Sequence, residues 1–218
     1  MTRRTDIQRD SRPSSHELFT SLEQKAELEA RNGLLQFDEV LRLVDESKQG
    51  FRLRPSTLQR LQRLAIKDIY TCAGNFRTGP VYISGTSHQP PDAAAIAEHV
   101  EEMCDYVNSH WATASALHLS SYLMWRVNWI HPFTGGNGRT SRAISYLVLC
   151  AKLGYRLPGT NTIPEQIVAN RQPYYRALDA ADAAWADGRV DVLEMERLLA
   201  EMLASQLASV LDAAEFSG

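Results

Sequence analysis

The chain has 218 residues, enough to bury a sizeable core in one domain, and its formal net charge is −3. Proteins that bind mainly nucleic acid or anionic membranes usually carry an excess of basic residues, and this chain has none. Hydrophobic residues make up 44% and charged residues 22% of the sequence, and no window approaches about 18 uninterrupted apolar residues, so we expect a globular protein with no membrane or nucleic-acid partner.

The N-terminal stretch MTRRTDIQRDSRPSS contains two adjacent arginines but no apolar segment after them, so we expect neither a signal peptide nor an export signal. Its polar composition predicts a disordered tail over residues 1–16. Cys72, Cys104 and Cys150 form no CxxC pair and lie in segments that otherwise read as helix. Buried free thiols in a reducing compartment explain them, and we expect a cytoplasmic location.

Apolar residues recur at helical spacing through residues 17–54, an N-terminal helical region in which Asn32-Gly33 indicates a break between two helices. A further helix begins after Pro55 and ends near Gly74. The character then changes in GNFRTGPVYISGTSHQPP, residues 74–91, which hold three glycines, three prolines and one short β-prone run, Val81-Tyr82-Ile83. Such a stretch is typical of a small β-hairpin or an extended flap.

Asp92 is placed to cap a helix that runs to about His110. Residues 113–130 and Arg142–Leu153 predict two helices that are apolar on most sides, and such helices belong in the middle of a fold. One helix that starts after Ile163-Pro164-Glu165 and carries Tyr174 and Tyr175 follows, and we expect the two rings to serve packing. A final amphipathic helix ends the chain's helical pattern. The Leu/Met periodicity of the last helix is typical of core or of a homodimer face. The sequence therefore predicts an all-α fold with a small β-hairpin flap.

The two central helices flank residues 131–142, HPFTGGNGRTSR. Gly135, Gly136 and Gly138 let backbone N–H groups approach a ligand without interference from Cβ atoms. The next helix begins at this loop, and its unpaired N–H groups and positive dipole end favour an anion there. The pattern predicts a phosphate cradle.

Three charged or titratable side chains accompany this cradle. Arg139 and Arg142 lie one helical turn apart and can supply planar, permanently charged groups to further phosphate oxygens. Two cations beside a positive helix end are unfavourable unless an anion joins them, which argues against an ordinary surface pair. His131 enters the loop in front of a proline, and an imidazole there can take a proton from an attacking hydroxyl.

The run HPFTGGNGRTSR resembles the signature of the Fic (filamentation induced by cAMP) family, HPF-x-[D/E]-G-N-G-R-x-x-R. Eight specified positions are met, namely His131, Pro132, Phe133, Gly136, Asn137, Gly138, Arg139 and Arg142. The flap segment and the order of helices around it are also similar to the family. The resemblance covers roughly residues 55–210 as a Fic-like domain with a Fic-type helical core, which leaves residues 211–218 as a C-terminal tail.

The resemblance implies transfer of part of a nucleotide, most often AMP from ATP as co-substrate, to a Ser, Thr or Tyr hydroxyl of a target protein. His131 then corresponds to the general base. Asn137 and the backbone of Gly136 and Gly138 hold phosphates, and Arg139 and Arg142 grip the phosphate tail. The flap run, Val81, Tyr82 and Ile83, is similar to the segment that clamps the target by strand addition.

Gly135 departs from the signature, since the family has Asp or Glu there and glycine has no side chain to ligate Mg²⁺. Three interpretations stay open. A carboxylate from elsewhere in the chain ligates the metal, or phosphates and water hold the metal during a slow transfer, or the site binds nucleotide without turnover. The other histidines show no tight metal-ligand spacing, and His99 with Cys104 is a poor zinc pair. The alternative function is a catalytically weak nucleotide- or peptide-binding module.

Many family members carry an inhibitory helix, [S/T]-x-x-x-E-[G/N], whose glutamate pairs with the second motif arginine. The segment KAELEARNG offers Glu29 for that role, with Lys25 and Ala30 at the flanking signature positions. Glu29 is expected to reach Arg142 if it inhibits, whereas the alternative is a glutamate on a solvated helix face.

Overall fold

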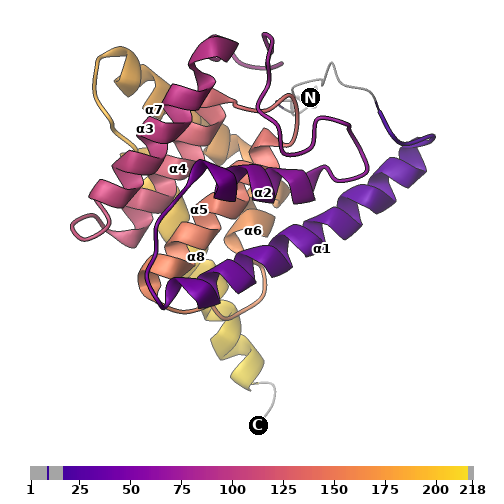
Figure 1. Ribbon diagram of the computed structural model, residues 1–218. Coiled ribbons are helices and arrows are strands. Elements are labelled where there is room, and N and C mark those ends of the chain that lie inside the picture. The colour runs from indigo at the N-terminus through magenta and orange to yellow at the C-terminus, as the bar shows by residue number, and fades with distance from the viewer. Residues whose placement is uncertain (1–8, 10–16, 216–218) are drawn as a thin grey trace, which may run out of the picture.

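The structure, a computed structural model, describes Arg9 and residues 17–215 (Figure 1). The rest of the tail predicted over residues 1–16 lies outside the described residues. The predicted all-α fold is confirmed, with helices α1 (Leu22–Ser47), α2 (Pro55–Ala65), α3 (Ile96–Ser109), α4 (Ala116–Ile130), α5 (Asn137–Leu153), α6 (Ile163–Ala169), α7 (Arg171–Ala186) and α8 (Leu193–Glu215). A 3₁₀ turn, Ala93–Ala95, precedes α3 and is capped by the Asp92 side chain, as its sequence predicts.

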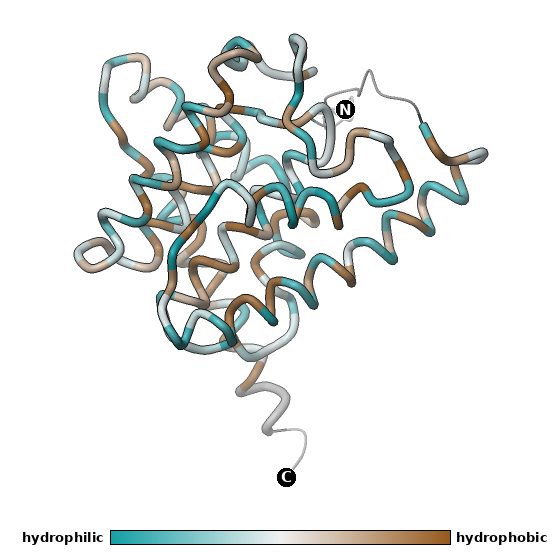
Figure 2. The backbone as a smooth tube through the Cα atoms, viewed as in Figure 1, coloured by the Kyte–Doolittle hydropathy of each residue, from teal (hydrophilic) through white to brown (hydrophobic). Residues whose placement is uncertain are grey.

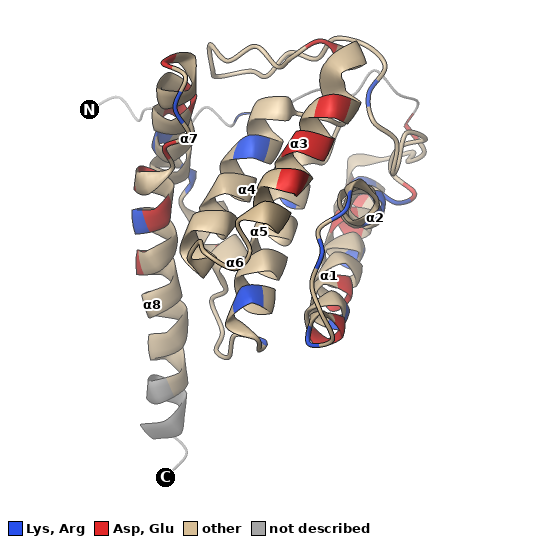
Figure 3. Cartoon of the chain, turned by 60° about the vertical axis from the view of Figure 1, so that its left-hand side comes forward, with Lys and Arg blue, Asp and Glu red and all other residues tan. Residues whose placement is uncertain are grey.

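Helices α4 and α5 form the centre of the fold, and α1, α2, α3, α7 and α8 pack around them (Figure 1). The hydropathy of the chain explains this order, because α4 and α5 are apolar on most sides while α1 alternates between polar and apolar residues (Figure 2). Charged side chains gather on α1 and along the outer face of α3 rather than on α4 and α5 (Figure 3). Full burial of a large side chain such as Trp125 or Leu123 stabilises the fold by roughly 1.5–3 kcal/mol.

Small side chains let α4 and α5 approach closely. The Ser120 hydroxyl donates to the Ser145 carbonyl oxygen at 2.7 Å, and the Ser145 hydroxyl donates to the Ser120 carbonyl oxygen at 2.9 Å. Both serines are buried, and because each hydroxyl has a partner, the hydrogen bonds offset the cost of removing the hydroxyls from water. This reciprocal pair fixes the two helices against each other and therefore fixes the ends of the loop that joins them.

The break expected at Asn32-Gly33 is wrong, because α1 continues through it from Leu22 to Ser47. Asn32 is fully buried and its side-chain amide donates to the carbonyl oxygen of Lys67 at 2.6 Å. That bond ties the middle of α1 to the turn after α2, which gives asparagine a tertiary role instead of a local breaking one.

The single helix expected to carry Tyr174 and Tyr175 is two helices. α6 ends at Ala169 and α7 begins at Arg171, with Asn170 between them in an extended conformation at φ −142° and ψ 96°. The helix predicted to end near Gly74 also stops earlier, at Ala65, and a series of turns follows. Each difference falls beside the loop that joins α4 and α5 and shapes its surroundings.

Residues 75–92 form the extended flap, and within the described residues no strand pairing of the predicted hairpin is present there. Arg77 holds the flap to the body. Its backbone N–H donates to the Pro132 carbonyl oxygen at 2.9 Å, and its buried guanidinium donates to the carbonyl oxygens of His131, Gly79 and Pro91. No helix within the described part of the chain is long and apolar enough to span a bilayer.

Candidate functional site

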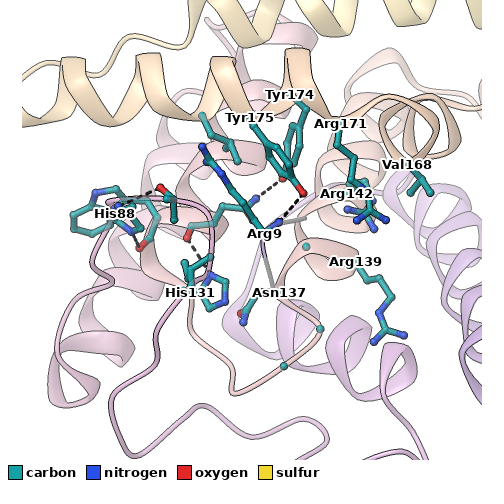
Figure 4. Close-up of a pocket in the computed structure, with 18 of the residues that line it drawn as sticks. Arg9, His88, His131, Asn137, Arg139, Arg142, Val168, Arg171, Tyr174 and Tyr175 are labelled. Carbon is teal, nitrogen blue, oxygen red and sulfur yellow. Dashed lines mark hydrogen bonds between the residues drawn. The ribbon is translucent and has the colours of Figure 1, made fainter. Parts of the chain in front are cut away.

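The loop between α4 and α5 opens into a cavity of about 890 Å³, within the usual range for a ligand pocket. Two left-handed residues bound the loop, His131 at φ 48° after α4 and Gly136 at φ 78° before α5. Figure 4 shows His131 on one side of the cavity, Arg139, Arg142 and Arg171 on the other, and Tyr174 and Tyr175 above. The sequence-predicted cradle and its histidine therefore face one space.

Asn137 closes the loop with its own side chain. The Phe133 backbone N–H donates to Asn137 Oδ1 at 3.0 Å, and Asn137 Nδ2 donates to the Phe133 carbonyl oxygen at 2.7 Å. Phe133 is fully buried and anchors the loop in the core. Both polar ends of the asparagine amide are thus used within the loop, and the groups left to face the cavity here belong to the backbone.

The start of α5 has no side-chain cap, because its N-cap residue is Gly136. A Cβ atom at Gly136 would lie 2.8 Å from the Ile66 side chain, so glycine is required for packing as well as for its positive φ. A Cβ at Gly138 would lie 3.4 Å from Arg142 Nη1. The uncapped first turn presents backbone N–H donors and the positive end of the helix dipole to the cavity.

Buried Gln62 of α2 supports the loop from below. Its side-chain amide donates to the Gly135 carbonyl oxygen at 3.0 Å and accepts from the Gly74 backbone N–H at 2.5 Å. One side chain therefore joins the loop to the base of the flap. Neither Gln62 nor Arg77 was identified from the sequence. The available signal for Gln62 was a polar residue within a helical pattern, and for Arg77 it was a charged residue within a glycine-rich stretch.

His131 is 6% exposed, and its Nδ1–H donates to the Asn128 carbonyl oxygen at 3.3 Å. That bond places the proton on Nδ1 and the lone pair on Nε2. Within the part of the chain that is described, Nε2 has no hydrogen-bond partner although it is buried. The pKa of His131 is lowered to about 3, mainly because the ring is buried and in smaller part because of the positive charge of Arg77, while the hydrogen bond to Asn128 opposes the shift. The imidazole is therefore neutral near pH 7, with an unused acceptor.

The depressed pKa of His131 makes stability depend on pH. The unfolded chain binds a proton at about pH 6.5 but the folded protein resists it, so the free energy of unfolding decreases as the pH falls from about 6.5 toward 3. In the wild type, this effect should lower the free energy of unfolding by about 1 kcal/mol per pH unit between about pH 6.5 and 5. We expect His131→Gln to lack this decrease when both proteins are unfolded with urea from about pH 7 to 5. The exposed His110→Gln serves as control, and an identical pH slope in wild type and His131→Gln would contradict the assignment.

Arg139 lies at the edge of the cavity toward α1. Its Nη1 donates to the Ala65 carbonyl oxygen at 2.9 Å, and its Nη2 lies 3.4 Å from Glu29 Oε1. Glu29 therefore meets the first motif arginine and not Arg142, where it was expected. The difference has a simple cause, since the unbroken α1 passes over the turn after α2, beside which Arg139 is held.

Arg142 and Arg171 project into the cavity next to each other (Figure 4). Burial lowers the pKa of Arg142, and the charges of Arg171 and Arg139 lower it further while Tyr174 opposes them. In the described ranges no carboxylate lies within ion-pairing distance of Arg142 or Arg171. Arg171 was not identified from the sequence, because its pattern predicted one continuous helix there and not a new helix that begins at Arg171.

The wall opposite the loop comes from α7. Tyr174 is buried and its hydroxyl accepts from Asn128 Nδ2 at 2.7 Å, as expected of a packing residue. Arg9 lies 4.7 Å from the Tyr175 ring centroid, and its guanidinium donates to both oxygens of Asp179 at 2.7 Å. Arg9 thus covers the outer side of Tyr175 and lines the same cavity.

The flap residues Val81, Tyr82 and Ile83 divide between the cavity and solvent. Ile83 lines the cavity, whereas Tyr82 is 83% exposed. Among the described residues, none of the three takes part in a backbone–backbone hydrogen bond. Their N–H and C=O groups therefore form an open edge of the kind that pairs with another extended chain.

The motif loop itself offers no carboxylate to a divalent cation. Position 135 is a buried glycine, and the described residues contain no group of three or more His, Cys, Asp or Glu side chains that could hold an ion. Divalent cations in nucleotide sites usually take one or two protein carboxylates. The carboxylates that line the cavity belong to Glu17, Glu29 and Asp182, and two of them have partners: Glu29 lies 3.4 Å from Arg139, and Asp182 accepts from Trp125 Nε1.

Residues 52–149 match the Fic/DOC family. The protein adenylyltransferase Fic of Drosophila willistoni is 32% identical over 145 residues, which are 60% of this chain and 27% of that protein. The relative with the same name from Drosophila melanogaster is 34% identical over 110 residues, or 50% of this chain and 20% of that protein. The chain therefore spans about a quarter of the length of these relatives.

Solved structures agree on the fold. A Fic domain containing signaling protein from Bacteroides thetaiotaomicron superposes with a TM-score of 0.67 at 21% identity, over 83% of this chain and 71% of that one. Residues 134–508 of Fic-1 from C. elegans give a TM-score of 0.66 at 22% identity, over 92% of this chain and 60% of that one. These proteins therefore share the helical fold of this chain.

Proposed function

Residues 52–149 form a Fic/DOC family domain, and from that premise we propose that the protein moves AMP from ATP to a Ser, Thr or Tyr hydroxyl of a target protein. Relatives named protein adenylyltransferase support this reaction at the level of the family. The observation that carries the proposal for this chain is the buried His131, whose unpartnered Nε2 stands beside the uncapped start of α5.

His131 is the general base in this proposal. The hydroxyl oxygen of the target attacks the α-phosphorus of ATP, its proton passes to Nε2, and pyrophosphate leaves with the electron pair of the broken P–O bond. A neutral imidazole with a free Nε2 can accept that proton at pH 7, while the Nδ1–H bond to Asn128 holds the ring in place. The negative charge of the bound triphosphate raises the basicity of the ring relative to the empty site.

The phosphates rest on the first turn of α5 in this proposal. The backbone N–H groups of Gly136, Asn137 and Gly138 and the positive helix end bind them, and Arg139 and Arg142 hold the phosphate tail. Asn137 acts by keeping the loop in shape, since its amide is bonded to Phe133. The loop backbone and Arg139 are held by hydrogen bonds before the ligand arrives, which lowers the cost of stabilising charge that develops in the transition state.

The target is a protein chain that adds to the open edge of the flap at Val81, Tyr82 and Ile83. Strand addition gives affinity through the backbone and tolerates varied side chains. Arg77 fixes both ends of the flap to the end of α4, so a peptide bound there lies close to His131.

Labelled nucleotide tests the proposal. Purified protein with α-labelled ATP and a cell extract should give labelled protein bands, and γ-labelled ATP should give none, because pyrophosphate leaves. A binding module, the second candidate, would bind ATP without any label transfer. Gly135 is the specific observation that favours that candidate, so a Gly135→Asp variant belongs in the experiment. If neither form transfers label while both bind ATP, the enzyme function is excluded.

Glu29 is proposed to weaken nucleotide binding by neutralising Arg139. The pair is partly exposed, so its loss is worth no more than about 1 kcal/mol. We expect Glu29→Gln to tighten ATP binding up to about fivefold by calorimetry and to raise transfer similarly. Glu27→Gln, an exposed change on the same helix, is the control. Unchanged affinity in Glu29→Gln would show that the glutamate is an ordinary surface residue.

A further inference from the structure

The break between α6 and α7 directs Arg171 into the cavity. Arg171 is the first residue of α7, and the extended Asn170 before it turns the chain so that α7 starts at the cavity wall. A cation in the first turn of a helix faces the positive dipole end, which is unfavourable. No side-chain cap offsets this cost, because Asn170 is the N-cap residue and its side chain makes no capping hydrogen bond. The position is therefore costly unless an anion binds there.

A second unfavourable feature is the closeness of Arg171 to Arg142. The charge of Arg171 is near enough to oppose the protonated form of Arg142, and Arg139 adds to the effect. Neither Arg142 nor Arg171 makes an ion pair or hydrogen bond with another residue that the structure describes. Like charges in a partly buried site repel strongly when no counter-charge is present. A polyanion that bridges the two guanidinium groups would relieve this repulsion.

The remaining observation is the glycine at position 135. Where the family signature places an acidic residue that can hold a divalent cation, this chain has Gly135, while it gathers Arg139, Arg142 and Arg171 around one end of the cavity. Of the carboxylates that line the cavity, Glu29 is paired with Arg139, and neither Glu17 nor Asp182 pairs with Arg142 or Arg171 among the described residues. A guanidinium and a metal ion both neutralise phosphate oxygens, but the guanidinium does so with directed, paired hydrogen bonds.

We propose that Arg171 and Arg142 together grip the terminal phosphates of a nucleoside triphosphate, so that this protein binds the nucleotide without a metal held by the protein. This inference rests on the proposed function and assigns a phosphate-binding residue that lies outside the signature motif. Because two guanidinium groups suit a chain of phosphates, Arg171 distinguishes a triphosphate from a monophosphate.

Calorimetric titration of the full chain with ATP and with AMP, each in Mg²⁺ and in EDTA, tests the inference. We expect wild-type affinity for ATP to change less than about threefold between Mg²⁺ and EDTA. Arg171→Gln should weaken ATP binding roughly 10- to 100-fold and AMP binding less than about threefold, since one charge-assisted contact to phosphate is lost. Arg171→Lys should recover part of the loss. Arg176→Gln, an exposed arginine on the same helix and outside the cavity, should bind as wild type does.

The outcomes separate this inference from the proposed function. If wild type binds ATP and Arg171→Gln binds it equally well, or if EDTA abolishes wild-type binding, the inference is overturned and the proposed function stands. If wild type binds no nucleotide in either condition, both are overturned. Thermal melting of each variant identifies a loss that comes from unfolding, and the ratio of ATP to AMP affinity decides between a phosphate contact and a general weakening.

Discussion

Replacing His131 by glutamine should lower AMP transfer by roughly two to four powers of ten and leave ATP affinity within about threefold. Glutamine fills a similar volume, and its amide N–H can donate to the Asn128 carbonyl oxygen as Nδ1 does now. It cannot accept a proton near pH 7. The variant therefore removes the proposed proton transfer, while the start of α5 and the arginines that are proposed to bind the phosphates stay in place.

The measurement is initial-rate label transfer from α-labelled ATP, combined with calorimetric ATP binding on the same preparations. His110→Gln is the matched control, because His110 is exposed and is not part of the cavity lining. Transfer by His131→Gln within about tenfold of wild type would mean that another group takes the proton. Equal loss of binding and transfer would assign His131 to nucleotide binding and not to catalysis.

The motif loop could be predicted from sequence because its chemistry is local. Three glycines, one histidine and two arginines within twelve positions fix the loop, the start of the next helix and the face that the arginines share. Helical periodicity was equally informative for α4 and α5, which are apolar on most sides. These features need no knowledge of distant parts of the chain.

The supports of the site could not be predicted, because they depend on contacts between segments far apart in sequence. Gln62 meets Gly135 across 73 positions, and Arg77 meets His131 across 54. Asn32 and Asn170 show that helix boundaries cannot be predicted from local sequence alone, because one prediction failed by placing a break and the other by omitting one. The first continues a helix because its amide bonds to Lys67, and the second breaks one where apolar periodicity suggested continuity.

Replacing Arg77 by methionine should cost roughly 3–5 kcal/mol of unfolding free energy, the largest stability effect among the changes considered. Arg77 is 5% exposed, and methionine fills a similar space without donors. The carbonyl oxygens of His131, Gly79 and Pro91 would then lose charge-assisted bonds in a region with little water. Arg77→Lys should recover only part of the stability, because a single ammonium group cannot reach carbonyls on three sides.

Urea unfolding measures the loss as a shift of the midpoint with little change of slope, and Arg176→Met, at an exposed site on α7, should change stability by less than about 0.5 kcal/mol. Arg77 joins both ends of the flap to the end of α4, so hydrogen exchange of amides in residues 78–91 should accelerate in Arg77→Met even under conditions where the helices stay protected. A midpoint shift without faster flap exchange would mean that the flap is held by other contacts. Because the same side chain bonds to the His131 carbonyl oxygen, AMP transfer by Arg77→Met should fall together with flap protection.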